Sequence, residues 1–227
     1  MYDDLRPLSL TDHTPRPRPP SRPAGESIAQ RECLLDAALH AFSHQGIANS
    51  SLRAIASAAG VTPALVNYYF GNKEKLLVAV VEERLLPLLM GLGQNLRQTG
   101  DEPIELVRGF IQGMRGVVAQ HPWLPPLWVR EVLCEGGGLR DLLMSRLAPL
   151  LPHMLAARFT AAQQRGALNP DLDPRLLVVS LIGLTLFPYA AAPIWRGFFP
   201  AAELDDDALA RHTIALLEHG LENPYER

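Results

Sequence analysis

The pattern of apolar and polar residues in the first third of the chain predicts a series of short helices. The first begins near Glu26, where Ser27 is placed to cap it, and ends at Gly46. Its apolar residues recur at helical spacing and would form one buried face, made of Ile28, Leu35, Leu39 and Phe42. We therefore expect this segment to be the first helix of a small folded unit.

Two shorter helices are predicted after the first. The second runs from about Leu52 to Gly60, and its cap is one of Asn49, Ser50 and Ser51. The third has Thr62 as its N-cap and Pro63 at its first helical position, where the missing N–H of proline costs nothing. It continues to about Tyr69, so both helices are only about two turns long.

Helical periodicity continues from Asn72, which caps a fourth helix starting at Lys73, almost to the end of the chain. We expect a hinge or kink in this helix near Pro87. No segment alternates as a strand does, so the fold class is all-α. Further helices are predicted over residues 104–120, 127–135, 139–165, 174–196 and 205–221.

The pattern divides the chain into three parts, and composition supports this division. Residues 1–25 are rich in proline and arginine and contain no apolar stretch of signal-peptide length, so we expect a disordered tail and not a secretion signal. Cys33 and Cys134 share no close spacing, so we expect a reducing, cytoplasmic location. Residues 26–75 would form an N-terminal three-helix domain, and residues 76–227 a larger helical domain. Because 48% of the residues are hydrophobic and 20% are charged, both domains can bury a core.

A long uncharged segment lies between Arg175 and Arg196 and has the length of a membrane span. Pro188 and Pro193 interrupt it, and its flanks have no excess of basic residues. A helix that is apolar all round can also be buried between protein neighbours. We therefore expect no membrane insertion, and we assign the helices near 174–196 and 205–221 to the interface of a homodimer.

The second and third helices, joined by a tight turn, have the shape that fits the major groove of B-DNA. Gly60 in the turn permits a backbone conformation that other residues resist, and Val61 would fill the space between the helices. Ile55, Val66 and Phe70 would complete a small core with the first helix. The outward residues of the third helix are then Thr62, Pro63, Ala64, Leu65, Asn67, Tyr68 and Tyr69. The pattern alone leaves open whether they contact DNA or only pack.

The stretch SLRAIASAAGVTPALVNYYFGNKEKLL, residues 51–77, resembles the DNA-binding signature of the tetracycline-repressor (TetR) family of bacterial transcription regulators. The similarity covers the chain from Gln30 to Leu77. It implies a helix-turn-helix domain followed by a helical domain for effector binding and dimerisation. It also implies that the protein binds a double-stranded DNA operator. We expect a homodimeric repressor that a small apolar or amphipathic effector releases, although the sequence leaves repression and activation both open.

The resemblance implies roles for individual residues of the helix-turn-helix. Arg53 would enter the major groove, and Thr62, Pro63 and Ala64 would face base edges. Leu65 stands where many relatives have a small hydroxyl residue, so it either reads shape or packs. Phosphate contacts, which fix register rather than sequence, are implied for Ser51, Asn67, Tyr68, Tyr69 and Lys73.

The effector pocket has no sequence signature of its own. Aromatic and sulfur-containing side chains of the C-terminal helices would suit a moderately apolar ligand, and ordinary core packing explains them equally well. The candidates are Phe110, Met114, His121, Trp123, Trp128, Cys134, Met144 and Phe187. Effector binding among these helices would move the fourth helix and change the spacing of the two reading helices.

Other functions are less well supported. His40 and His44 are one helical turn apart but no third ligand is evident, so we expect no metal or other cofactor. Neither Cys33 nor Cys134 has a recognisable partner base, and the glycine run 136–138 follows no strand and lacks the lysine of a phosphate-binding loop. A helical enzyme, and a protein-binding adaptor that does not bind DNA, stay as alternatives, although we expect no enzymatic activity.

Overall fold

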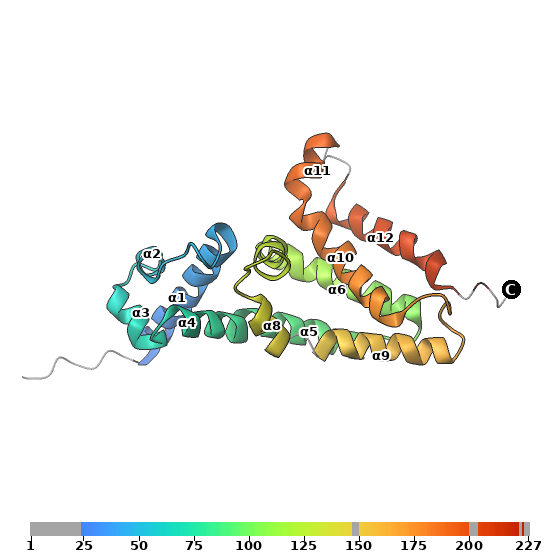
Figure 1. The fold of residues 1–227 in the computed structure, drawn as a ribbon, viewed down its shortest axis with the longest axis horizontal. Coiled ribbons are helices and arrows are strands. Elements are labelled where there is room, and N and C mark those ends of the chain that lie inside the picture. The colour runs from blue at the N-terminus through green and yellow to red at the C-terminus, as the bar shows by residue number, and fades with distance from the viewer. Residues whose placement is uncertain (1–23, 147–149, 200–203, 223, 225–227) are drawn as a thin grey trace, which may run out of the picture.

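The computed structural model describes residues 24–146, 150–199, 204–222 and 224. Every regular element among these residues is a helix, as predicted (Figure 1). The predicted disordered tail lies outside the described residues except for residues 24 and 25, which begin the first helix.

A smaller lobe holds the N-terminal helices, and one long helical arm leads from it into a larger lobe (Figure 1). The elements of the smaller lobe and the arm are α1 (Ala24–Gln45), α2 (Leu52–Ala58), α3 (Pro63–Phe70), α4 (Lys73–Val80), η1 (Val81–Leu85) and α5 (Leu86–Arg97). The remaining elements are α6 (Pro103–Gln120), α7 (Leu124–Trp128), η2 (Val129–Leu133), α8 (Arg140–Arg146), α9 (Leu150–Gln164), α10 (Pro174–Ala190), α11 (Ala192–Phe198) and α12 (Asp206–Leu221).

Glycines and caps set the boundaries of the short helices. Gly46 and Gly60 end α1 and the α2 turn with φ values of 86° and 67°, which confirms the conformation predicted for Gly60. Ser51 is the cap of α2, since its hydroxyl oxygen accepts the Ala54 amide at 3.1 Å. The cap predicted at Ser27 is wrong: α1 begins at residue 24, because its first turn extends further back than the apolar pattern indicates.

The first hydrophobic cluster joins the smaller lobe to part of the larger one. The small core predicted from sequence is confirmed, with Leu35, Leu39, Phe42, Ile55, Val66 and Phe70 all buried in it. Ile28, which was expected on the same face, is 63% exposed. The cluster also contains Leu127 and Leu143, so it continues beyond the domain boundary predicted at residue 75.

The arm contains a π-helical turn, η1, where the sequence predicts an interruption. Pro87 lies in the first turn of α5, directly after it. Proline has no N–H to donate to the carbonyl of Glu83 four residues earlier, which disfavours an uninterrupted α-helix. The amide of Leu86 instead bonds to the carbonyl of Val81, five residues back.

Three predicted helices have different boundaries in the structure. The helix predicted over 127–135 begins earlier, at Leu124, because Pro125 and Pro126 are tolerated in a first turn. Within the helix predicted over 139–165, the structure describes α8 and α9, and residues 147–149 between them lie outside the described residues.

The helix predicted over 174–196 is also two helices, α10 and α11. Pro193 lies in the first turn of α11, where it cannot continue the hydrogen bonds of α10. The Trp195 indole donates to the carbonyl of Pro188 at 2.7 Å across the bend. Among the described residues no single helix is long and apolar enough to cross a membrane. Only α10 and α11 together reach that length and hydropathy, and they are bent by 68°.

The second hydrophobic cluster forms the core of the larger lobe. It is built by α5, α6, α9, α10 and α12, with Phe110 and Phe159 fully buried at its centre. Trp128 packs against both clusters, so it lies where the two cores meet. The larger lobe therefore has its own core but shares a border with the smaller one.

Candidate nucleic-acid interface

Helices α2 and α3 form a helix-turn-helix whose inner side is fully buried. Ile55 and Val66, one from each helix, are 0% exposed, and Val61 in the turn packs against the same cluster. Because these side chains fix the two helices to α1, the opposite side of α3 is presented as a rigid surface. This is the geometry that a recognition helix requires.

The outer surface of α3 carries most of the residues predicted to face DNA. Thr62, Pro63, Ala64 and Asn67 are exposed, and Tyr68 is 79% exposed, which is unusual for an aromatic side chain without a partner surface. Leu65 is half-buried. Ser51 and Arg53 are exposed at the start of α2.

Thr62 occupies the N-cap position of α3 but makes no side-chain capping hydrogen bond. Its extended backbone, with φ −81° and ψ 150°, is that of an N-cap, and Pro63 follows at the start of the helix. The hydroxyl is therefore not committed to the first turn of α3. It can donate to an acceptor on DNA, whereas Pro63 has no N–H and the Leu65 amide already donates to the Thr62 carbonyl at 3.0 Å.

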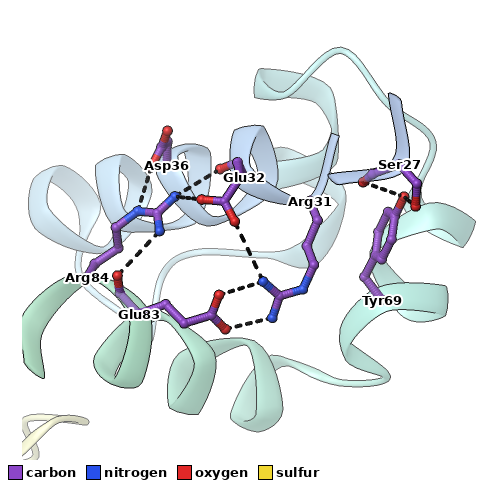
Figure 2. Close-up of polar contacts among 7 residues, drawn as sticks. All are labelled: Ser27, Arg31, Glu32, Asp36, Tyr69, Glu83 and Arg84. Atoms are coloured by element: carbon purple, nitrogen blue, oxygen red, sulfur yellow. Dashed lines mark hydrogen bonds and ion pairs between the residues drawn. The ribbon is translucent and has the colours of Figure 1, made fainter. Parts of the chain in front are cut away.

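Tyr69 and Lys73 are engaged within the protein. The Tyr69 hydroxyl donates to the carbonyl of Ser27 at 3.0 Å and lies 2.8 Å from the Ser27 hydroxyl, which fastens α3 to α1 (Figure 2). The Lys73 ammonium donates to the carbonyl of Ala48 at 3.2 Å, in the segment between α1 and α2. Both side chains thus hold the helix-turn-helix in place, whatever they contact on DNA.

The charge of this region is weakly positive. No Asp or Glu occurs between Asp36 and Glu74, whereas Arg53 and Lys73 lie in that interval. A surface without carboxylates does not repel phosphates, even where few cations attract them. This local absence of acidic residues is a sequence signal that net charge, averaged over the chain, conceals.

A set of ion pairs between α1 and the arm was not predicted from the sequence. Arg31 binds Glu83 through both guanidinium nitrogens, at 2.5 and 2.6 Å (Figure 2). Arg84 binds Glu32 at 2.7 Å and Asp36 at 2.8 Å. The hydrogen bond from Arg31 holds the pKa of Glu83 below its ordinary value, and the same bond raises the pKa of Arg31.

The residues predicted for the effector pocket are not gathered around one cavity. Phe110 and Met114 are buried in the second cluster, as ordinary core packing would have them. Met144 and Phe187 are exposed, by 61% and 65%, and Cys134 is exposed as well. His121 and Trp123 form an edge-to-face pair, and Trp123 packs against the first cluster.

A small cavity of about 100 Å³ lies instead between α5 and α9. Its walls are mainly apolar, with Gln94 and Arg97 adding polar groups. The apolar lining comes from Leu86, Leu89, Met90, Gly93, Leu151 and Met154. Ligand pockets usually have about 300–1,000 Å³, so this cavity would have to widen to hold an organic effector.

His40 and His44 stack on each other, with ring centroids 4.0 Å apart. Nδ1 of His44 lies 2.9 Å from the carbonyl of His40, so the pair interacts within its own helix. In the described part of the chain no group of three or more His, Cys, Asp or Glu side chains is arranged to hold a metal.

Comparison with known proteins agrees with this architecture. A family model described as bacterial regulatory proteins of the tetR family matches residues 34–80. The regulator RutR of Escherichia coli (strain K12) is 26% identical over 186 residues, which is 82% of each chain. The regulator BetI of Rhizobium meliloti (strain 1021) is 43% identical over 61 residues, but these span only 27% of this chain and 30% of BetI.

Solved structures share the fold over nearly their full length. The transcriptional regulator FadR of Bacillus subtilis, in complex with stearoyl-CoA, has a TM-score of 0.67 and 21% identity, covering 84% of this chain and 99% of FadR. NalD of Pseudomonas aeruginosa, the secondary repressor of the MexAB-OprM multidrug efflux pump, has a TM-score of 0.63 and 24% identity, covering 88% and 99%.

A buried scaffold that presents a short capped helix, followed by a larger helical domain, defines a DNA-binding transcription regulator of the helix-turn-helix class. The family match spans α2 and α3 and the start of the arm, and the RutR match extends over most of the chain. By these matches the chain is similar to the TetR family of bacterial transcription regulators.

Proposed function

We propose that the chain is a repressor that binds its operator as a homodimer and is released by a small apolar or amphipathic effector. The observation that carries this proposal is the exposed outer surface of α3. Thr62 at its start makes no capping hydrogen bond with its side chain, and Tyr68 projects from it. Such a surface offers donors to DNA acceptors, and the other described parts of the chain leave it exposed.

We assign different tasks to the exposed residues of the helix-turn-helix. Arg53 and the segment Thr62–Ala64 would read base edges, because they stand at the starts of α2 and α3. Asn67 and Tyr68 would contact phosphates, with Ser51 and Lys73 beside them. Tyr69 serves mainly to anchor α3 to Ser27, since its hydroxyl is bonded there.

The proposed homodimer uses the unpartnered side of α10. Large apolar residues are exposed there at helical spacing, namely Leu176, Val179 and Phe187, and Leu216 is exposed on neighbouring α12. Apolar surface of this kind is buried when two copies pair around a two-fold axis. A dimer formed through α10 and α12 would place two reading helices on successive turns of one DNA face.

The effector class is supported by the chemistry of the cavity and by the named ligand or role of two neighbours. FadR was solved with stearoyl-CoA, and NalD represses a multidrug efflux pump. The cavity between α5 and α9 offers leucine and methionine side chains beside Arg97, which suits a largely apolar molecule with a polar end. Because α5 continues into η1 and α4, separating α5 from α9 would move the arm that enters the smaller lobe.

A mobility-shift titration on the DNA upstream of the protein's own gene tests the proposal. The double variant Arg53→Ala, Lys73→Ala should bind at least tenfold more weakly. The salt slope, meaning the steepness with which the logarithm of the binding constant falls with the logarithm of salt concentration, decreases by about 0.9 for each lost phosphate contact. The control Arg108→Ala, Arg165→Ala removes two cations from the larger lobe and should leave binding unchanged. Wild-type protein that binds the operator no better than a scrambled duplex would disprove the proposal.

A further inference from the structure

A second connection between the two lobes, separate from the arm, is centred on the buried carboxylate of Glu131. Glu131 lies in η2 and is 5% exposed. Its Oε1 accepts the amide of Ile47 at 3.0 Å, and its Oε2 accepts the amide of Gly138 at 3.0 Å. Burial of a charged group is costly unless hydrogen bonds replace its water, and here each oxygen receives one N–H.

The amide of Ile47 lies in the turn between α1 and α2, and this turn sets the orientation of the helix-turn-helix. It follows Gly46, which ends α1, and precedes Ser51, which caps α2. Within this turn the Ser50 hydroxyl donates to the carbonyl of Gly46 at 2.7 Å, and the Ser50 amide donates to the carbonyl of Ile47 at 3.2 Å. The turn is therefore rigid in itself, and Glu131 fixes it to the larger lobe.

The glycine run 136–138, which does not fit a phosphate loop, has a place in this connection. A Cβ on Gly138 would lie 3.2 Å from Cδ1 and Cγ2 of Ile47, so only glycine lets the two segments meet without displacement. The run also returns the chain to Glu131, whose own carbonyl accepts the Leu139 amide at 3.1 Å.

Two arginines form hydrogen bonds that hold η2 in place. Arg130 donates to the carbonyl of Ser43 at 3.2 Å, near the end of α1. Arg140 donates to the carbonyls of Val132, Leu133 and Cys134 at 2.7–2.8 Å. A cation that binds the last carbonyls of a helical segment stabilises its C-terminal end, so η2 is fixed in its π-helical form.

Helix α7 and η2 also reach the second core. They form one continuous helical segment, α7 packs against α10 as well as α1, and Trp128 at its centre touches both hydrophobic clusters. A displacement of α10 or of the core beneath it would be transmitted through this segment to the Glu131 carboxylate and on to the α1–α2 turn. The hydrogen bonds of Glu131 join residues outside α4, although α4 shares the first hydrophobic cluster with α7 and η2.

We infer that Glu131 is a positioning residue for operator binding. Its carboxylate fixes the α1–α2 turn, and with it α2 and α3, to the larger lobe through hydrogen bonds that do not pass through α4. This inference rests on the proposed operator-binding function. Glu131 touches no DNA, so removing its hydrogen bonds changes the orientation of the reading helix and not the number of phosphate contacts.

The test compares Glu131→Gln with Glu135→Gln, which removes an exposed carboxylate four residues away. The glutamine amide keeps the size of the side chain but leaves one of the two N–H donors without an acceptor. We expect operator affinity to fall about tenfold, which corresponds to about 1.4 kcal/mol, with the salt slope unchanged. Hydrogen exchange of the segment around Ile47 should accelerate in Glu131→Gln and not in the control.

A second variant keeps the inference testable if Glu131→Gln does not fold. Gly138→Ala keeps the Glu131 carboxylate but adds a Cβ 3.2 Å from the Ile47 side chain, so it should also lower operator affinity. Gly116→Ala in α6, where a Cβ has open space, is its control. Folded variants that bind the operator within twofold of wild type would overturn the inference alone. Failure of the wild type to bind the operator would instead overturn the proposed function.

Discussion

The DNA-reading surface and the α10 surface are both exposed, but they leave opposite kinds of side chain uncovered. The outer side of α3 shows small and polar residues around a single aromatic ring, Tyr68. The outer side of α10 shows Leu176, Val179 and Phe187. DNA demands donors and shape at the recognition helix, whereas self-association demands apolar area.

The two hydrophobic cores differ in a related way. The first contains residues of the smaller lobe together with Leu127 and Leu143 from beyond the arm, whereas the second lies within the larger lobe. The core of the smaller lobe is thus completed by side chains from beyond the arm. The two lobes therefore share packing at their border, where Trp128 contacts both cores.

The largest effects are expected when a large side chain is removed from one core at a time. Phe42→Ala and Phe159→Ala each remove a fully buried ring, so each should lower the free energy of unfolding by about 3–5 kcal/mol. Phe42→Ala should abolish operator binding while the dimer persists, and Phe159→Ala should weaken the dimer as well. Urea unfolding and analytical sedimentation measure both effects. Equal loss of dimer in the two variants would show that the cores are one cooperative unit.

A charge on the α10 surface should separate self-association from folding. Val179→Asp places a carboxylate where a second copy would bury an apolar residue that is 63% exposed in one copy. We expect a monomer with at least hundredfold weaker operator binding, or about 2.7 kcal/mol. Met144→Asp alters an equally exposed residue on α8 and is the control. A Val179→Asp protein that sediments as the wild type does would refute the assigned interface.

The adjacent tyrosines of α3 have different predicted roles, since Tyr69 anchors the helix and Tyr68 contacts DNA. Tyr69→Phe removes the hydrogen bonds to Ser27 and should lower the free energy of unfolding by about 1 kcal/mol. Tyr68→Phe removes a hydroxyl from an exposed ring, so it should leave stability unchanged and weaken operator binding severalfold. Thermal unfolding and mobility shifts of the two variants provide each other's control. The opposite pattern would assign the phosphate contact to Tyr69.

The sequence predicted the smaller lobe closely because local signals fix it. Caps and helix-ending glycines such as Ser51 and Gly46 act within one turn, and the buried positions follow one period. The larger lobe was predicted less well. Its breaks depend on which prolines a helix tolerates: Pro188 lies within α10, whereas a new helix, α11, begins at Ala192 with Pro193 in its first turn.

Contacts between distant segments could not be read from periodicity. Glu131 is 84 positions from Ile47, and its role depends on a π-helical turn that no local pattern announces. The same reason explains why the predicted pocket residues did not gather. Aromatic and sulfur side chains such as Phe110 fill a core and line a pocket equally well, and only the packing of helices decides between these outcomes.

The smallest expected effect concerns the ion pair that ties α1 to the arm. Arg31 keeps the pKa of Glu83 below its ordinary value of 4.5, so the folded protein binds this proton less readily than the unfolded chain. The pair therefore stabilises the fold fully above about pH 4.5, and its contribution is lost as the pH falls. Because both side chains are about one-third exposed, solvent screening limits the contribution to about 0.5 kcal/mol.

Urea unfolding of Glu83→Gln at several pH values checks this expectation. The variant should be less stable than wild type near neutral pH, and the difference should vanish in acid because wild-type Glu83 is then protonated as well. Arg31→Gln removes the other partner and should flatten the same part of the profile, and the double variant should add little more. A difference between Glu83→Gln and wild type that stays constant down to the acid limit would mean that packing, and not the charge pair, joins α1 to the arm.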